Sequence, residues 1–300
     1  MPFRQTRVLT HRLAVGAAVV VVLASSKLGG QSRPALLDKV SVEVTAVAES
    51  SEYLVYRYRI VNPASNRAGV ALVSIDVSAP RGAGRLMLPL TGTVERGGSD
   101  VSDRVPVGVI VPERWKAMLG YRAQLKWYAE EAGPVVNDSW IPANADSVAP
   151  GTAKDGFGIR STYLPGFRRF YAEPTLESCC AHPIPGDPEG AHPSQSAFLV
   201  RGITVGPVVH PSQVTLALLR SYVQDVCNSR WIAEAAVCMQ LRTGVEQVIS
   251  ARGRGDTQSA KDGLGKLIRD LDDQHGPGKP VNENAYWLLK LNAEYLRRQL

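Results

Sequence analysis

The chain has 300 residues, and its 34 Lys and Arg against 28 Asp and Glu give a formal net charge of +6 at pH 7. Four of the basic residues lie in the first 31 residues, which hold no acidic residue, so the remainder carries a net charge of only about +2. No basic stripe is interleaved with aromatic residues, and the charge pattern therefore argues against a nucleic-acid partner.

The start of the chain predicts a secretory signal peptide over residues 1–31. A basic segment with Arg4, Arg7 and Arg12 precedes an uncharged apolar run over residues 13–24, and small residues follow up to Ser26. We expect cleavage after Ser26 or a few residues later. The apolar run is shorter than the roughly 20 residues that span a bilayer, but an uncleaved N-terminal anchor is the alternative. No second hydrophobic run occurs, so we expect no membrane span after cleavage and a secreted, periplasmic or cell-envelope location.

Period-two alternation dominates the first half of the chain and is typical of half-buried strands. In one run, Leu54, Tyr56, Tyr58 and Ile60 fall on one face, and Val55, Arg57, Arg59 and Val61 fall on the other. Further short alternating runs follow, separated by turn residues and without a helical period between them. The sequence predicts an antiparallel β-sandwich domain over residues 37–175.

Two Pro-Gly turns punctuate the end of this region. The second, at Pro165 and Gly166, separates a strand expected near residues 157–161 from one near residues 167–172, and we expect the two strands to form a closing hairpin. This succession resembles secreted bacterial Ig-like domains, which implies an Ig-like sandwich and names no ligand. A Pro-rich segment over residues 176–211 follows, and it is expected to be a stiff tether that contains one strand.

After residue 211 the apolar residues recur at helical spacing. Ser212, Asp256 and Asn282 are expected to be N-caps. The inner faces should hold Val214, Leu218, Val223, Val237, Leu241, Val245, Val248, Ala260, Leu264, Leu267, Leu271, Ala285, Leu289, Ala293, Leu296 and Leu300. Short loops between these segments favour a small antiparallel helical bundle over residues 212–300. Gly263 and Gly265 should weaken the third helix by about 1 kcal/mol each.

Three segments of this last third carry a family resemblance. They are WIAEAAVCMQLRTGV (residues 231–245), ARGRGDTQSAKDGLGKLIRDLDDQHGPGKPV (residues 251–281) and NAYWLLKLNAEYLRRQL (residues 284–300). The region resembles the FIMAH domain, a small helical module of secreted bacterial metalloproteases, adhesin-like proteins and surface proteins. The resemblance implies an accessory, non-catalytic module with no catalytic residue and no settled ligand.

The four cysteines of an exported chain predict disulfides. Cys227 and Cys238 bracket the link between the first two helices, where a bridge would tie the helix ends together and add roughly 3 kcal/mol of stability. The FIMAH resemblance favours this pairing, because related bundles often carry cysteines near these positions. Cys179 and Cys180 then remain, and adjacent cysteines close only a strained ring. The alternative joins both of them to Cys227 and Cys238, which would staple the tether to the bundle.

A metal site is the competing interpretation of the tether. Cys179, Cys180, His182 and His192 offer thiolate and imidazole ligands that suit zinc or copper. Their spacing matches no known zinc finger, and a proline after each histidine restricts the backbone. We therefore expect no metal and no cofactor, and we interpret the His-Pro pairs, including His210, as stiff linker and turn residues.

Three smaller features of the sequence could also belong to a binding or modification site. The Arg-Gly-Asp tripeptide at residues 254–256 is expected to be a loop in which Asp256 caps a helix, rather than an integrin attachment motif. Asn137 begins a glycosylation sequon. Trp231, Tyr286 and Trp287 are expected to fill the bundle core, although an outward-facing aromatic surface is the alternative.

No catalytic residue is predicted, because the zinc-binding helix, nucleophile-elbow and P-loop motifs are absent. We expect a secreted, non-enzymatic protein that binds a cell-surface polymer or a protein partner. The first alternative is a metal-binding protein or a hydrolase centred on residues 155–210. The second is a purely structural component of the cell envelope.

Overall fold

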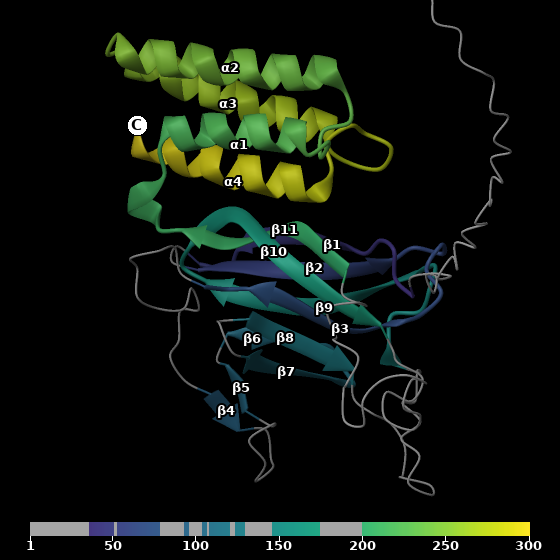
Figure 1. The fold of residues 1–300 in the computed structure, drawn as a ribbon. Helices are drawn as coiled ribbons and strands as arrows, with labels where there is room; N and C mark the ends of the chain where they lie inside the picture. The colour runs from purple at the N-terminus through teal and green to yellow at the C-terminus, as the bar shows by residue number, and fades with distance from the viewer. Residues whose placement is uncertain are drawn as a thin grey trace, which may run out of the picture. The chain divides into compact units, whose positions relative to one another are not determined.

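The computed structural model describes residues 36–50, 53–78, 93–95, 104–106, 108–120, 124–129, 146–174 and 200–300. Residues Ala35–Leu300 form one compact unit. Figure 1 shows that this unit contains antiparallel β-sheets, and that the C-terminal part of the chain forms four helices. The prediction of an antiparallel β part followed by an α-helical part is confirmed. The expected signal peptide lies outside the described residues.

The first sheet has four antiparallel strands in the order β1-β2-β9-β6. They are β1 (Ser41–Ala48), β2 (Leu54–Asn62), β9 (Thr152–Ser161) and β6 (Val109–Ile110). In β2 the alternation is confirmed, because Tyr56, Tyr58 and Ile60 are buried whereas Arg57 and Arg59 are exposed. The two arginines therefore lie on the outer face of this sheet.

The second sheet has five antiparallel strands in the order β11-β10-β3-β8-β7. They are β11 (Val200–Val209), β10 (Leu164–Pro174), β3 (Val70–Asp76), β8 (Gln124–Ala129) and β7 (Trp115–Gly120). The short strands β4 (Thr93–Glu95) and β5 (Arg104–Pro106) pair with each other. The strand that we expected inside the tether is β11, and it pairs with β10 along most of its length.

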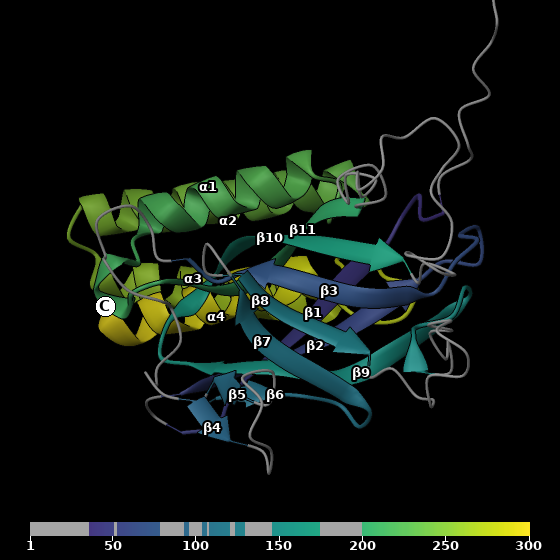
Figure 2. The ribbon, with the colours of Figure 1, turned by 60° about the horizontal axis from the view of Figure 1, so that its bottom comes forward.

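Aromatic side chains from both sheets meet in the space between them. Phe157 of β9 makes edge-to-face contacts with Trp115 of β7 and Trp127 of β8, with ring centroids 4.8 Å and 6.0 Å apart. Tyr58 of β2 lies 5.9 Å from the ring of Trp127. Such pairs add to the hydrophobic stabilisation that burial of the rings provides. The two sheets thus share one core, and in Figure 2 the strands of the second sheet cross in front of β1 and β2.

The expected closing hairpin is wrong. β9 pairs with β2 and β6 in the first sheet, whereas β10 pairs with β3 and β11 in the second sheet. Only two residues separate β9 from β10, so the chain crosses from one sheet to the other at this corner. The expected turn at Pro165 and Gly166 lies within β10, next to a register shift between Leu164 and Pro165. A Pro-Gly pair therefore marks an irregularity in a strand and not a reversal of the chain.

The helical part consists of four helices joined by short loops, and they lie side by side in Figure 1. They are α1 (Leu216–Asn228), α2 (Ala235–Gly253), α3 (Thr257–Gln274) and α4 (Glu283–Gln299). The N-caps at Asp256 and Asn282 are confirmed, because each side chain accepts a backbone N–H three residues later. The expected cap at Ser212 is wrong. Ser212 belongs to a short 3-10 helix, and Thr215 caps α1 through the N–H of Leu218.

Gly263 in α3 allows close packing against α2, although glycine has a low helix propensity. A Cβ atom at Gly263 would lie 2.7 Å from Cγ2 of Val248 in α2, closer than real Cβ contacts. Val248 is fully buried, and a β-branched side chain has little freedom to turn away. The missing side chain therefore lets α2 and α3 approach each other, which offsets the roughly 1 kcal/mol that glycine costs in a helix.

Helix α4 joins the bundle to the exposed edge of β1. Nδ2 of Asn284 donates to the carbonyl of Val42 at 3.0 Å, and Oδ1 of Asn284 accepts the N–H of Val44 at 2.9 Å. An edge strand otherwise presents such backbone groups without partners. The single side-chain amide thus makes the two hydrogen bonds that a neighbouring strand would make at this position, and Asn284 is only 7% exposed.

Two further side chains join the same elements. The hydroxyl of Thr204 in β11 donates to the Val42 carbonyl at 2.7 Å, and so links the edges of the two sheets. Nδ2 of Asn292 in α4 donates to the carbonyl of Pro165 in β10 at 3.0 Å. Both side chains are fully buried. α4 is therefore held against both sheets by directed hydrogen bonds as well as by apolar contacts.

We predict that Asn284→Leu destabilises the protein by about 2 to 3 kcal/mol. The carbonyl of Val42 would keep the Thr204 hydroxyl, but the N–H of Val44 would lose the Asn284 oxygen, and an unpaired buried group costs about 1 to 3 kcal/mol. Urea unfolding measures the change. Gln299→Leu, at an exposed position of the same helix, is the control. Equal effects of the two substitutions would contradict this role.

A pair of glycine substitutions tests the contact between α2 and α3. Gly244→Ala should raise the stability by up to about 1 kcal/mol, because its Cβ would lie 3.6 Å from the Leu267 side chain, an ordinary contact. Gly263→Ala should lower the stability, because overpacking against Val248 outweighs the same gain in helix propensity. Urea midpoints compare the two variants. An equal stabilisation by both would show that α3 does not need glycine at residue 263.

Candidate functional site

The bridge between the first two helices is present in the structure. The sulfur atoms of Cys227 and Cys238 are 2.21 Å apart, and their Cα atoms are 5.8 Å apart. The enclosed loop contains Arg230, which has a positive φ of 58°, and the N–H of Trp231 donates back to the carbonyl of Val226. The bridge therefore spans the tight connection that orients α2 relative to α1.

The residues of the alternative metal site cannot be compared with the fold. Cys179, Cys180, His182 and His192 lie outside the described residues, as does the sequon at Asn137. Within the described ranges, no group of three or more His, Cys, Asp or Glu side chains is arranged to hold a metal ion.

The Arg-Gly-Asp loop connects α2 to α3. Oδ1 of Asp256 accepts the N–H of Ser259, and hydrogen bonds with the side chain and backbone of Ser259 lower the pKa of the Asp256 carboxyl. Gly255 has a positive φ of 79°, and Arg254 donates to the hydroxyl of Ser250. The predicted role of Asp256 as a helix cap is confirmed.

The aromatic residues of the bundle mostly pack inward. Trp231 contacts Phe167 of β10 with ring centroids 5.2 Å apart, and Tyr286 is 7% exposed and stacks on His275. Trp287 is partly buried against the core. These contacts agree with the expected core role and give no outward-facing aromatic surface at these three positions.

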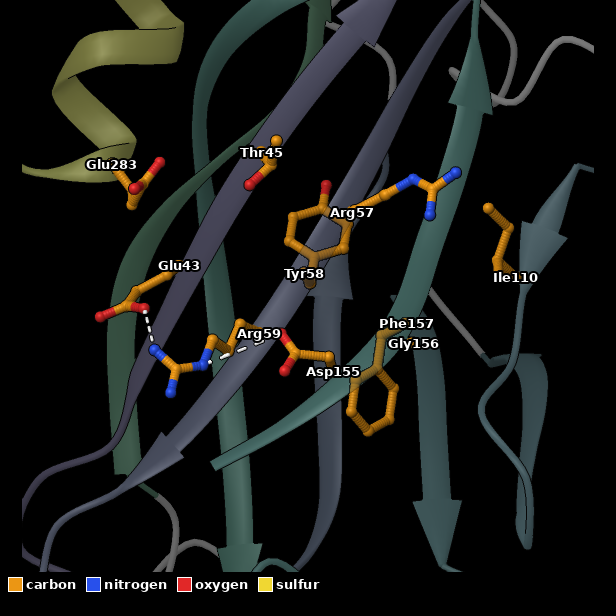
Figure 3. A pocket seen from close by; sticks show the side chains of 10 residues that line it. All are labelled: Glu43, Thr45, Arg57, Tyr58, Arg59, Ile110, Asp155, Gly156, Phe157 and Glu283. Carbon is orange, nitrogen blue, oxygen red and sulfur yellow. Dashed lines mark hydrogen bonds and ion pairs between the residues drawn. The ribbon is translucent and has the colours of Figure 1, made fainter. Parts of the chain in front are cut away.

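A hollow on the outer face of the first sheet is the candidate site, and we call it the sheet-face hollow (Figure 3). It has a volume of about 300 Å³. The residues that line it are Glu43, Thr45, Arg57, Tyr58, Arg59, Ile110, Asp155, Gly156, Phe157 and Glu283. They come from β1, β2, β6 and β9 and from the first turn of α4, so five separate segments of the chain build it.

One row of residues across the sheet is nearly free of charge. Thr45 of β1 pairs with Arg57 of β2, which pairs with Gly158 of β9, which pairs with Ile110 of β6. Residues paired across antiparallel strands point to the same face, so all four lie on the outer face. The guanidinium of Arg57 is the only charge in this Arg57 row. No described residue forms an ion pair or a hydrogen bond with that guanidinium.

The neighbouring row concentrates charge around Arg59, and we call it the Arg59 row. Nη1 of Arg59 lies 3.3 Å from Oε2 of Glu43, and Nε of Arg59 lies 3.8 Å from Oδ1 of Asp155. Figure 3 draws both ion pairs, with Glu283 of α4 beside Glu43. Two carboxylates therefore pair with one guanidinium, and a third, that of Glu283, lines the same hollow.

Two glycine residues of β9 shape this face of the sheet. A Cβ atom at Gly158 would lie 2.7 Å from the carbonyl oxygen of Tyr56 and 3.0 Å from Cδ1 of Ile110. Gly156 has a positive φ of 98°, next to a register shift between β2 and β9. Such a bulge re-aims the side chains around it. Only glycine suits both positions without a local rearrangement.

A network at the ends of α3 and α4 holds Glu283. Oε1 of Glu283 lies 3.0 Å from Nε2 of His275, which forms an ion pair when the imidazole is protonated, and Oε2 accepts the indole N–H of Trp287 at 3.1 Å. The ring of His275 stacks on Tyr286, with centroids 3.8 Å apart. The position of Glu283 in the first turn of α4 also suits a negative charge, because the helix dipole is positive there.

Tyr286 continues the network to an ion pair. The hydroxyl of Tyr286 and the ammonium of Lys290 both donate to Oδ1 of Asp272 at 2.7 Å. Burial by itself raises the pKa of Asp272, but the hydrogen bonds from Lys290 and Tyr286 outweigh burial and leave this pKa below its ordinary value. Burial by itself lowers the pKa of Lys290, but its hydrogen bonds to Asp272 and to the Tyr286 hydroxyl outweigh burial and leave this pKa above its ordinary value.

The sheet-face hollow offers charges and the hydroxyls of Thr45 and Tyr58, of which the Tyr58 hydroxyl is buried, and its lining residues include no Ser, Cys or His. The Thr45 hydroxyl has no imidazole or amine beside it among these residues, and the carboxylates of Glu43 and Asp155 are paired with Arg59. The charged groups of the hollow can bind ligand groups of opposite charge. Guanidinium groups take carboxylates or phosphates, and carboxylates take ammonium or guanidinium groups.

A second hollow of about 570 Å³ lies between α1 and α2. It is lined by Ala217, Arg220, Ser221, Val223, Gln224, Arg242, Val245 and Glu246. Arg220 and Glu246 pair across it at 3.4 Å. This hollow joins only two neighbouring helices, and its ion pair already bridges them, so it is the weaker candidate.

None of the lining residues is recognisable from the sequence as a site residue. Alternation places Arg57 and Arg59 on the outer face, and the short connection between β1 and β2 could have placed Glu43 opposite Arg59, because turn length sets the register of a hairpin. Asp155 and Glu283 are far away in the sequence, and no local pattern brings them to β2.

Comparisons with known proteins give no family for this chain. A scan against models of known protein families gives no match, and a search of curated proteins gives none at a significant level. The FIMAH-like and Ig-like resemblances therefore stay predictions. Within the described part of the chain, no helix combines the length and the apolar composition that crossing a membrane requires.

The lowered pKa of Asp272 predicts a stability that falls in acid. A carboxyl whose pKa is lower in the folded state stabilises the fold above its unfolded pKa of about 3.9, and this contribution is lost as the pH falls through the folded pKa. Asp272→Asn should therefore unfold more easily than the wild type at pH 6, and the difference should shrink below about pH 4. Urea midpoints across this range measure it. Asp273→Asn is the control, and the same pH dependence in both variants would contradict the prediction.

Proposed function

We propose that the chain is an exported, non-catalytic binding protein of the cell envelope, which contacts a cell-surface polymer or a protein partner. The observation that carries the proposal is the sheet-face hollow, which gathers charged side chains from four segments, β1, β2, β9 and α4. The leader-like start and the bridged cysteines support export, because disulfides persist in oxidising compartments. The low net charge after the leader gives no reason to expect a nucleic-acid partner.

We also propose that the β part is Ig-like. Ig domains place strands A, B, E and D in one sheet and strands G, F and C in the other. The order β1-β2-β9-β6 and the order β11-β10-β3 match these two sets when the strands are taken in chain order. The strands β7 and β8 depart from the pattern, because they follow β6 in the chain whereas the extra strands of variable-type domains precede D. The usual disulfide between strands B and F is also missing, since β2 and β10 contain no cysteine.

For the C-terminal helices we propose a FIMAH-like accessory bundle. The helix lengths, the caps at Asp256 and Asn282 and the bridged cysteines support this proposal. The buried hydrogen bonds of Asn284 and Asn292 to the sheets support a bundle that is integrated with the β part. Its role would be to position the edge of the sheet-face hollow, through Glu283, in addition to any contact of its own.

The test of this function combines binding with turnover. Purified protein should co-sediment saturably with cell-envelope fragments from the organism that encodes it, and salt should weaken this binding because exposed charges are screened. The double variant Arg57→Gln and Arg59→Gln should bind more weakly than the wild type. Arg169→Gln, at an exposed position of β10 in the other sheet, is the matched control.

Two results would overturn the proposed function. Saturable turnover of a glycan or a peptide by the purified protein would make it an enzyme. Failure to bind any envelope fraction at low salt would remove the binding role and favour a purely structural component.

A further inference from the structure

We propose that the sheet-face hollow binds an extended peptide segment that carries an acidic and a basic side chain two positions apart. This proposal rests on the proposed function, because it names the kind of ligand that the same hollow takes. It depends on three features of the described residues: an unpaired cation in the Arg57 row, surplus negative charge in the Arg59 row, and the spacing between the two rows.

The Arg57 row supplies a site for a carboxylate. Arg57 is exposed, and no described residue pairs with it, whereas Arg59 on the same strand already has two carboxylate partners. Its neighbours in the row, Thr45 and Gly158, carry no charge. A planar guanidinium binds a carboxylate through two parallel hydrogen bonds. Thr45, the β1 residue paired with Arg57, carries a hydroxyl on the same face of the sheet.

The Arg59 row supplies a site for a cation. Glu43 and Asp155 pair with the guanidinium of Arg59, and Glu283 lines the same hollow, so three carboxylates stand against the one guanidinium of this row. Their side chains are 37%, 75% and 41% exposed, which leaves oxygen atoms accessible to a ligand. Nε2 of His275 lies 3.0 Å from Oε1 of Glu283, and this contact is an ion pair only when the imidazole is protonated. A Lys or Arg side chain of a ligand would add the missing positive charge.

The spacing of the two rows selects the ligand geometry. Glu43 pairs with Arg59, so Glu43 and Arg57 are diagonal neighbours on adjacent strands. The Cα atoms of such neighbours are about 7 to 8 Å apart. In an extended peptide, side chains at positions i and i+2 point to the same side and lie about 7 Å apart. Side chains at i and i+1 point to opposite sides. A peptide with its two charges at i and i+2 therefore matches the hollow, and one with adjacent charges does not.

The lining residues favour a peptide over a glycan or a polyanion. Sugar rings commonly stack on exposed aromatic faces, but the two aromatic residues of the hollow, Tyr58 and Phe157, are only 2% and 1% exposed. A polyanion would meet the three carboxylates of the Arg59 row. Ile110 is 38% exposed at the β6 side of the hollow, where it can contact the aliphatic part of a peptide side chain.

Titration by NMR with defined peptides tests the proposal. The probes are Ac-Ala-Glu-Ala-Lys-Ala-NH2 and its reversed order Ac-Ala-Lys-Ala-Glu-Ala-NH2, and the control peptide is Ac-Ala-Glu-Lys-Ala-Ala-NH2, which has adjacent charges. At least one of the two probes should shift the side-chain Nε–H signal of Arg57 and the amide signals of β2 saturably. The control peptide should bind about fivefold more weakly or not at all, the factor that about 1 kcal/mol for one exposed ion pair gives.

Protein variants localise the effect. Arg57→Gln should weaken the better probe about fivefold, while Arg169→Gln on the other sheet should leave its affinity unchanged. Because Arg57 is exposed, Arg57→Gln should keep the circular dichroism spectrum and the urea midpoint of the wild type. Arg57→Glu should prefer Ac-Ala-Lys-Ala-Lys-Ala-NH2 over both mixed-charge probes, which a merely structural arginine would not produce.

The outcomes separate this proposal from the proposed function. If the wild type binds envelope fragments but no probe shifts Arg57, or if Arg57→Gln leaves probe binding unchanged, the peptide site is overturned and the binding function stands. Equal binding of the probe and the adjacent-charge control would also overturn it, because the row spacing would then select nothing. If neither envelope fragments nor probes bind, both proposals fail.

Discussion

The two hydrogen bonds between the Asn284 amide and the edge of β1 are the interaction on which the rest of the arrangement depends. They satisfy the Val42 carbonyl and the Val44 N–H, and they fix the N-terminus of α4 at one position along the strand. Apolar contacts alone would let a helix slide along a sheet, because they have no direction. Glu283 is the residue before Asn284, so the same anchor delivers its carboxylate to the sheet-face hollow. The position of the bundle on β1 therefore also sets the position of one carboxylate of the hollow.

Glycine and a strand irregularity complete the hollow from the opposite side. The register shift between β2 and β9 brings Asp155 to Arg59, and Gly156 adopts the positive φ that this path requires. Gly158 lets the Ile110 side chain pack closely against β9, where a Cβ atom would lie 3.0 Å from Cδ1 of Ile110. The irregular path of β9 therefore determines which side chains stand next to the two arginines.

The sequence predicts what depends on local pattern and misses what depends on distant partners. Alternation in β2 and the caps at Asp256 and Asn282 are local, and they are confirmed. The crossing from β9 to β10 depends on which strands each of them pairs with, and the local sequence does not contain this information. Likewise, no sequence pattern predicts the positive φ of Arg114, the residue before β7. The hollow forms only where β6, β9 and α4 meet β2, and these contacts are not visible in the sequence. Alternation in β2 therefore predicts the outward position of Arg57 and Arg59 but not the residues that surround them.

Arg168 and Arg169 show this limit at adjacent positions. They are equivalent in the sequence, yet Arg169 is exposed and Arg168 is only 7% exposed. Three nitrogen atoms of Arg168 donate to the carbonyls of Pro207 and Ser78, and burial lowers the pKa of its guanidinium. A charge between the sheets is tolerated only with such partners, and they come from segments that alternation cannot identify. Composition therefore does not reveal which arginine is structural and which can meet a ligand.

The link between Asn284 and Glu283 gives the hollow a thermodynamic consequence. A ligand that contacts Glu283 when α4 is docked on β1, and loses that contact when α4 is undocked, stabilises the docked state by linkage. Binding and docking then favour each other without any change in the shape of either sheet. The Asp272, Tyr286 and Lys290 network acts on the same helix, because it ties α4 to α3 one turn beyond Glu283. The polar contacts of α4 thus connect the stability of the bundle with the charge pattern that the first sheet presents.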